Sequence, residues 1–129
     1  MFILRGASVF APEPLGTVEV LVGGGRILAI EPHFDLPPSL AMPVDLQGHV
    51  LVPGLVDVHA HLTGGGGEGG AETRVPPVGP VAVVGAGVTT VVGLLGTDAT
   101  TRNIRELLAA ARGLDALGLT AFCYTGSYE

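Results

Sequence analysis

The chain has no lysine, a single cysteine and few charged side chains, and these shortages exclude several classes of protein. Cys123 has no second cysteine with which to form a disulfide within the chain. The six basic residues are all arginine, twelve acidic residues oppose them, and the formal net charge is −6. A chain of this charge is poorly suited to the phosphate backbone of a nucleic acid. We therefore predict no nucleic-acid partner.

The sequence also lacks the features of a secreted or membrane-spanning chain. Its N-terminus has no basic region followed by an apolar segment and a cleavage site. The uncharged stretch from Val75 to Thr97 is long enough to cross a membrane, but Pro76, Pro77 and Pro80 interrupt it. We therefore predict a cytoplasmic protein with no membrane association.

The surface encoded by this sequence is unusually apolar for a small domain. The chain has 129 residues, of which 14% are charged and 47% apolar, whereas ordinary soluble domains have about 25% charged residues. The length by itself suggests one domain. We infer that part of this chain was shaped to pack against protein that the sequence does not contain.

Two histidines close a predicted strand in the middle of the chain. Leu55–Val58 is a short apolar run between Pro53-Gly54 and a glycine cluster, as expected of a buried strand. His59 and His61 are two positions apart, so both imidazoles would point to the same side of a strand. There they could converge on one metal ion such as zinc. Two histidines at a polar strand end, without a metal, remain an equally good interpretation of the pair alone.

A glycine run around one carboxylate follows the histidines. Gly64–Gly67 precede Glu68, and Gly69 and Gly70 follow it. Ordering such a segment costs much conformational entropy, so a glycine run of this kind needs a reason. One reason is close approach of the backbone to a ligand, with Glu68 as the charged contact. The alternative is a flexible linker with a solubilising glutamate. A phosphate-binding loop is disfavoured because the lysine and hydroxyl residue of that motif are absent.

Glycine and proline punctuation predicts a β-rich region followed by alternating strands and helices. Residues 1–50 are predicted to form a small β-domain, with strands at Phe2–Phe10, Thr17–Val22, Arg26–Ile30 and Met42–Leu46. Residues 51–129 are predicted to continue from the histidine strand with a helix at Pro76–Ala86, a strand at Val88–Leu95, a helix at Thr101–Leu117 and a strand at Thr120–Ser127. We expect Thr101 or Asn103 to cap the second helix. The alternation is typical of a parallel β/α sheet, and we assign the chain to the α/β class.

The polar residues of interest follow the ends of predicted strands. His59 and His61 end the first, Thr97 follows the second and Tyr128 follows the third. In β/α barrels the chemistry lies at the carboxyl ends of the strands. A helix-cap role for Thr97 and an inert terminal aromatic for Tyr128 are the alternatives.

Three motifs carry a family resemblance. The run P-G-L-V-D-V-H-A-H, from Pro53, resembles the first barrel strand of the amidohydrolase superfamily. H-A-H-L-T-G-G-G-G-E-G-G resembles the isoaspartyl (β-aspartyl) dipeptidases, as do A-G-V-T-T-V-V-G-L-L-G-T-D at 86–98 and Y-T-G-S-Y at 124–128. The resemblance implies a TIM-type β/α barrel, of which this chain would hold the first three strands and two helices. A small β-sandwich-like domain would precede that partial barrel.

The resemblance also implies a reaction and roles for individual residues. The reaction is hydrolysis of a β-aspartyl dipeptide by water activated at a binuclear zinc centre, with His59 and His61 as ligands of one metal. The substrate-binding residues would be Gly66, Gly67, Glu68, Thr97 and Tyr128. Glu68 would receive the substrate's α-ammonium group, and the Tyr128 hydroxyl would donate a hydrogen bond to the developing oxyanion, so both are catalytic candidates.

Parts of that centre are absent from this sequence. The resembling family bridges its two metals with a carbamylated lysine, and this chain has no lysine. We therefore interpret the chain as the N-terminal portion of a longer enzyme, inactive alone, whose full-length form would be a homo-oligomer acting on a small dipeptide. Two alternatives stay open. One is a dihydroorotase-like or hydantoinase-like amidohydrolase, and the other is a non-catalytic truncated remnant.

Overall fold

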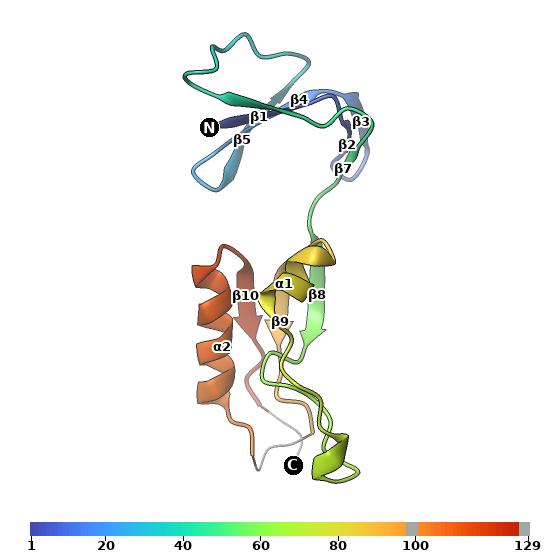
Figure 1. The fold of residues 1–129 in the computed structure, drawn as a ribbon, viewed down its shortest axis with the longest axis vertical. Coiled ribbons are helices and arrows are strands. Elements are labelled where there is room, and N and C mark those ends of the chain that lie inside the picture. The colour runs from blue at the N-terminus through green and yellow to red at the C-terminus, as the bar shows by residue number, and fades with distance from the viewer. Residues whose placement is uncertain (98–100, 127–129) are drawn as a thin grey trace. The chain divides into compact units, whose positions relative to one another are not determined.

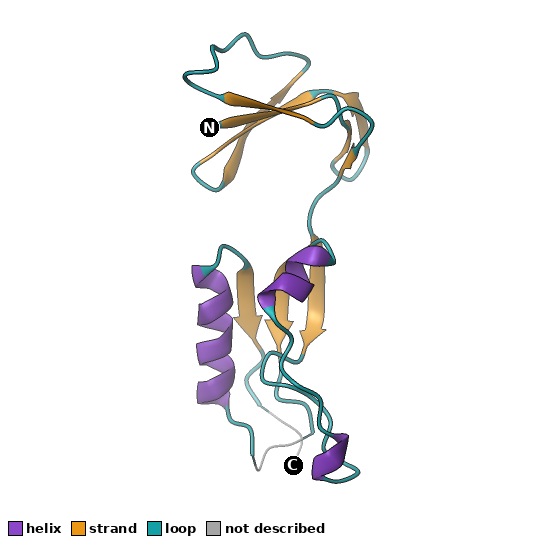
Figure 2. Ribbon diagram, viewed as in Figure 1, coloured by secondary structure: helices purple, strands orange, loops and turns teal. Residues whose placement is uncertain are grey.

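The computed structural model describes residues 1–97 and 101–126, and the chain divides into two compact units (Figure 1). The first unit is Met1–Pro53 and the second is Gly54–Glu129. The fold is mixed α/β, as the sequence predicted, with strands in both units and helices in the second (Figure 2).

The first unit contains two small sheets. A four-stranded sheet has the order β5-β4-β1-β6 and a three-stranded sheet has the order β3-β2-β7. Their strands are β1 (Phe2–Arg5), β2 (Ser8–Phe10), β3 (Pro14–Thr17), β4 (Glu19–Gly23), β5 (Arg26–Glu31), β6 (Met42–Asp45) and β7 (Val50–Leu51). The main apolar side chains of this unit are Ile3, Val9 and Val20, each at most 4% exposed.

The chain changes sheet at two places where the sequence predicted a continuous strand. The predicted strand Phe2–Phe10 is wrong, because Gly6 adopts φ +84° and separates β1 from β2. A Cβ at Gly6 would lie 3.1 Å from the backbone of Gln47, so this left-handed position favours glycine. The second break is at Val18, where β3 ends and β4 begins in the other sheet.

A charged cluster ties a loop to the four-stranded sheet. Arg5 Nε pairs with Glu19 Oε1 at 2.9 Å, and the Phe34 N–H donates to Glu19 Oε2 at 2.7 Å. His33 Nδ1 lies 3.2 Å from Glu19 Oε1. Burial acts to raise the pKa of Glu19, but the hydrogen bonds from Phe34 and His33 and the charge of Arg5 outweigh burial and leave the pKa below its usual value. Glu19 is therefore ionised at neutral pH and joins β4 to the segment that contains Phe34.

The second unit is a parallel sheet with helices. Its elements are β8 (Leu55–Ala60), the 3₁₀ helix η1 (Ala71–Thr73), α1 (Pro80–Gly85), β9 (Val88–Gly93), α2 (Ile104–Ala116) and β10 (Thr120–Cys123). The strand order is β10-β9-β8, with parallel pairing on both sides of β9. Strand, helix, strand, helix and strand thus follow one another as the sequence predicted. Among the described residues, the helices are all too short or too polar to cross a membrane.

Both helices are shorter than predicted, for different reasons. The predicted start of the first helix at Pro76 is wrong, because Val75 pairs with Gly65 and the Val78 N–H donates to the His61 carbonyl at 3.4 Å. The helix begins only at Pro80. The second helix begins after Asn103, whose side chain accepts the Glu106 N–H, so Asn103 rather than Thr101 is the cap.

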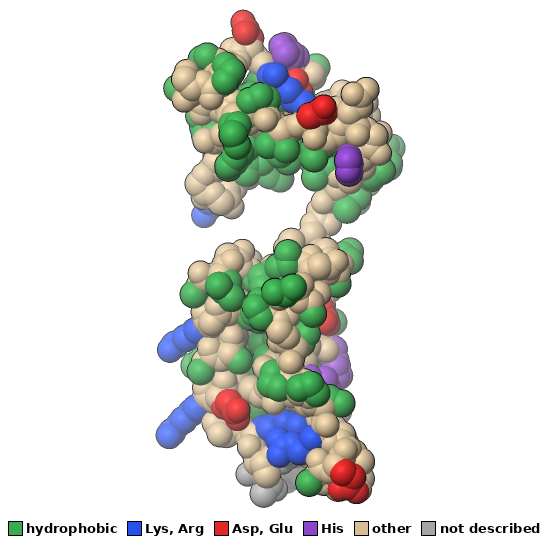
Figure 3. Space-filling view, viewed as in Figure 1, with side chains coloured by type: hydrophobic (Ala, Val, Ile, Leu, Met, Phe, Trp, Pro, Cys, Tyr) green, Lys and Arg blue, Asp and Glu red, His purple; other side chains and the backbone are tan. Residues whose placement is uncertain are grey.

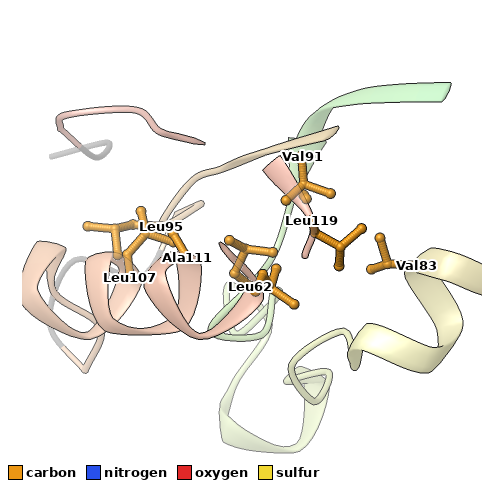
Figure 4. Packing of buried hydrophobic residues seen from close by; sticks show 9 residues of the cluster. Leu62, Val83, Val91, Leu95, Leu107, Ala111 and Leu119 are labelled. Atoms are coloured by element: carbon orange, nitrogen blue, oxygen red, sulfur yellow. The ribbon is translucent and has the colours of Figure 1, made fainter. Parts of the chain in front are cut away.

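The core of the second unit lies between α2 and one side of the sheet. Leu107 and Ala111 of α2 pack with Val91 of β9, Leu119 and the other side chains of the cluster, and Val83 comes from α1 (Figure 4). Leu107 is fully buried and Val91 is 1% exposed. Burial of such side chains supplies most of the favourable free energy of folding.

The prediction that β8 is buried is wrong for most of the strand. Val56 is 61% exposed and Val58 is 58% exposed, while Ala60 at the strand's end is 4% exposed. β8 is an edge strand of the sheet, so one of its sides has no neighbouring strand among the described residues.

We predict that Glu19→Gln lowers the free energy of unfolding of the first unit by about 1.5–3 kcal/mol, the usual range for hydrogen bonds to a charged group. Because the pKa of Glu19 is lowered on folding, its contribution is present above the unfolded value of 4.5 and is lost as the pH falls through the folded value. Urea unfolding at pH 7 and pH 3, followed by NMR signals of the first unit, measures both effects. Glu13→Gln, at an exposed position, is the matched control. Equal stability of wild type and Glu19→Gln at pH 7 would contradict the prediction.

Candidate functional site

The two histidines of the predicted metal site lie side by side. His59 is the penultimate residue of β8 and His61 follows the end of the strand. Their ring centroids are 5.3 Å apart and the ring planes are inclined at 69°. The His59 N–H donates to Asp57 Oδ1 at 2.9 Å. The two imidazoles are thus close enough to approach a common ligand.

His61 is held in a narrow space between two glycines. A Cβ at Gly96 would lie 2.9 Å from His61 Cε1, and a Cβ at Gly65 would lie 3.1 Å from His61 Cγ. The Nδ1 atom of His61 is buried and has no hydrogen-bond partner among the described residues. Buried polar atoms are normally satisfied, so this ring nitrogen is suited to a ligand such as a metal ion.

A pocket of about 210 Å³ opens beside the histidine pair. Its lining includes Asp57, His59 and His61 together with Val83 of α1. The space-filling view shows histidine side chains at the β8 edge of the second unit and acidic side chains over the loop that contains η1 (Figure 3). The described residues contain no group of three or more His, Cys, Asp or Glu side chains that could hold a metal.

The glycine run folds into a hydrogen-bonded loop. Gly65 and Val75 exchange both backbone hydrogen bonds, at 3.2 and 2.9 Å, and so close the two arms. Gly66 has φ +65°, and a Cβ there would lie 2.4 Å from the Thr73 carbonyl oxygen. This close approach excludes a side chain at Gly66. The ordered arms favour the ligand-binding interpretation of the run over the linker interpretation.

Glu68 lies near the tip of this loop, in contact with Thr97. Thr97, between β9 and α2, donates its hydroxyl hydrogen to Glu68 Oε1. That hydrogen bond is the main cause of a lowered pKa of Glu68, followed by a backbone N–H bond. Burial acts to raise the pKa, but these two hydrogen bonds and the charges of Arg102 and His61 together outweigh it. Glu68 is exposed and ionised at neutral pH. The loop thus presents a fixed carboxylate to solvent.

Sequence reasoning missed Arg102. Its side chain is 2% exposed, and its guanidinium donates to the Gly66 carbonyl at 3.0 Å and to the Gly65 carbonyl at 2.8 Å. Arg102 directly precedes the cap of α2, and in the sequence it resembles any other arginine near a helix start. The contact with a loop more than thirty residues earlier depends on how the chain packs, so no local signal in the sequence marks it.

The structure brings most of the predicted site residues together in two groups. His59 and His61 form one group. Gly66, Gly67, Glu68 and Thr97 form the other, and His61 is near enough to Glu68 to affect its pKa. Tyr128, the predicted oxyanion contact, lies outside the described residues.

Comparisons with known proteins support the resemblance. The crystal structure of a β-aspartyl dipeptidase from Fervidobacterium islandicum AW-1, in complex with the β-Asp-Leu dipeptide, is 43% identical, covers 98% of this chain and superposes with a TM-score of 0.89. A dihydroorotase from Staphylococcus epidermidis is 30% identical over 110 residues, or 83% of this chain. An imidazolonepropionase from Pseudomonas aeruginosa is 37% identical over 117 residues, or 84% of this chain. No family model matches the chain.

The match covers only part of each relative. The chain spans 33% of the dipeptidase, 25% of the dihydroorotase and 28% of the imidazolonepropionase. These relatives belong to the amidohydrolase superfamily of hydrolases. The resemblance predicted from the sequence is therefore confirmed: over nearly its whole length this chain resembles part of the β-aspartyl dipeptidases of the amidohydrolase superfamily.

Proposed function

We propose that this chain supplies the amino-group anchor and two metal ligands of an enzyme that hydrolyses β-aspartyl dipeptides. The observation that carries the proposal is the Glu68 carboxylate, held by the Thr97 hydroxyl on an ordered glycine loop. The similarity to a dipeptidase whose structure contains β-Asp-Leu supports this choice of substrate.

Glu68 is proposed to bind the α-ammonium group of the substrate. A dipeptide with a free α-amino group is positively charged there at neutral pH, and an ionised carboxylate is its natural partner. The lowered pKa of Glu68 keeps the carboxylate charged. Gly66 and Gly67 carry no side chains that would block a ligand from reaching the loop backbone. Thr97 would hold the carboxylate in one orientation before the substrate arrives.

His59 and His61 are proposed to hold one metal of a binuclear zinc centre. The adjacent rings and the unpartnered Nδ1 of His61 fit this role. When bound, zinc supplies Lewis acidity and allows water to act as a nucleophile near neutral pH. Tyr128 keeps its proposed role of donating a hydrogen bond to the oxyanion.

The proposal assigns this chain only part of a catalytic centre. A binuclear centre needs ligands beyond the histidine pair, and the chain has no lysine to bridge two metals. We propose that the second unit is part of a β/α barrel and the first unit a flanking β-domain, as in a longer cytoplasmic homo-oligomer. The 129-residue chain alone is expected to have no dipeptidase activity.

A second candidate function is hydrolysis of a cyclic amide. The 30% identity with a dihydroorotase over 110 residues favours it. The ordered glycine loop with Glu68 argues against it, because a ring amide presents no free α-ammonium group to pair with a carboxylate. Binding of dihydroorotate or a hydantoin in preference to β-Asp-Leu would favour this second candidate.

We predict that the purified chain binds zinc weakly, at no more than one ion per chain, and that His59→Ala abolishes the binding. Two imidazoles leave the remaining positions of a zinc ion to water, and such a site is weak. Elemental analysis after dialysis against micromolar zinc measures the stoichiometry. His49→Ala, which alters an exposed histidine of the first unit, is the control. Two tightly held ions per chain would contradict the half-site interpretation.

We predict that Glu68→Gln weakens binding of β-Asp-Leu by about tenfold or more, because a charged hydrogen-bonded contact is lost. Binding to the wild-type chain is expected to persist as the pH falls below the ordinary glutamate value of 4.5 and to be lost when Glu68 itself is protonated. Titration of the ¹⁵N-labelled chain, followed by amide chemical shifts, measures the affinity.

Glu72→Gln is the matched control for this prediction, since it removes one negative charge from η1 in the same loop. It should bind β-Asp-Leu as the wild type does. N-acetyl-β-Asp-Leu, which lacks the ammonium group, should bind wild type and Glu68→Gln equally weakly. Equal affinity of wild type and Glu68→Gln for the unmodified dipeptide would exclude Glu68 as the anchor.

A further inference from the structure

Arg102 is a charged side chain that is almost completely buried, at 2% exposure. Burying a guanidinium is unfavourable unless its donors are satisfied. Two of its nitrogens, Nη1 and Nη2, donate to the carbonyls of Gly66 and Gly65, successive residues of the glycine loop. The planar fork of arginine suits such a pair of acceptors.

The carbonyl of Gly65 accepts one hydrogen bond from within the loop and one from Arg102. It accepts the Val75 N–H at 2.9 Å, which closes the loop, and Arg102 Nη2 at 2.8 Å. The carbonyl of Gly66 accepts Nη1 at 3.0 Å. Gly66, two residues before Glu68, is in the left-handed conformation, with φ +65°. Arg102 therefore holds the base of the loop whose tip carries the carboxylate.

The residues that follow Arg102 are anchored in the fold. Asn103, the next residue, caps α2, and Leu107 one turn later is fully buried in the core. Thr97, in the same connection between β9 and α2, holds the side chain of Glu68. One connection thus contacts the glycine loop at its base and at its carboxylate.

We propose that Arg102 is a positioning residue that, by donating to the Gly65 and Gly66 carbonyls, fixes the glycine loop so that Glu68 is preorganised for the substrate's α-ammonium group. This inference rests on the proposed function of Glu68. Preorganisation lowers the entropic penalty of binding, because the loop need not be ordered when the ligand arrives. A lysine at this position would keep the charge and lose the forked pair of donors.

The test compares Arg102→Lys and Arg102→Gln with wild type in the ¹⁵N-labelled full chain. Hydrogen exchange of the Gly65 and Val75 amides reports the order of the loop base, and exchange of the Leu107 amide reports the core. We expect both variants to exchange the loop amides at least about tenfold faster while Leu107 stays protected. Arg105→Gln, at an exposed position of α2, is the matched control and should change neither. Unchanged loop exchange in both Arg102 variants would overturn the proposal.

A second measurement separates positioning of Glu68 from a merely structural role. Arg102→Lys should weaken β-Asp-Leu binding by about tenfold, and it should weaken it no further in a Glu68→Gln background, because it acts through Glu68. Additive losses would overturn the proposal. Thr97→Val should weaken binding of β-Asp-Leu, as Arg102→Lys does, but should leave hydrogen exchange of the Gly65 and Val75 amides unchanged.

The two readouts also separate this inference from the proposed function. If wild type fails to bind β-Asp-Leu, the proposed function fails, whereas loss of loop protection in Arg102→Lys would still support the role of Arg102 in fixing the loop. If wild type binds and Arg102→Lys binds equally well, the positioning role fails and the proposed function stands. Loss of Leu107 protection along with the loop amides in Arg102→Lys would show a structural role and overturn the proposal.

Discussion

The second unit depends on the close approach of the two arms of its glycine loop. Gly65 and Val75 exchange backbone hydrogen bonds, and Gly66 lies so near the Thr73 carbonyl that a Cβ would be 2.4 Å from that oxygen. The arms can close in this way only because glycine has no side chain and can adopt a positive φ. The Val75 pairing in turn holds the segment before α1 in an extended form, so the closure shapes the start of that helix as well as the loop.

Polar contacts from the β9–α2 connection also stabilise the glycine loop. The guanidinium of Arg102 binds backbone carbonyls at the base of the loop, and the Thr97 hydroxyl binds the carboxylate at its tip. The hydrogen bond from Thr97 lowers the pKa of Glu68 and so favours its ionised form. His61 lies between Gly65 and Gly96, so the same loop also bounds the histidine pair. The proposed metal ligand His61 and the proposed substrate anchor Glu68 are thereby linked through one short stretch of backbone.

Much of the secondary structure could be predicted because its signals are local. The apolar period and the Asn103 cap located α2, and β-branched runs located β8 and β9. The errors occurred where contacts with residues distant in the sequence determine the local structure. Gly6 divides a predicted strand because the two halves pair in different sheets, and the first helix starts late because Val75 is engaged by Gly65. The exposure of Val56 and Val58 was missed because an apolar run does not reveal whether another layer will cover it.

For the candidate site, the motifs and their spacing selected His59, His61, Glu68 and Thr97 as candidates and indicated the family that they resemble. This was possible because each motif is a short contiguous stretch of the sequence. The pairing of Thr97 with Glu68 and the burial of Arg102 against the glycine carbonyls could not be obtained in that way. Those contacts join residues 29 to 37 positions apart. They form because the β9–α2 connection packs against the glycine loop, and packing between distant segments leaves no periodic trace in a single sequence.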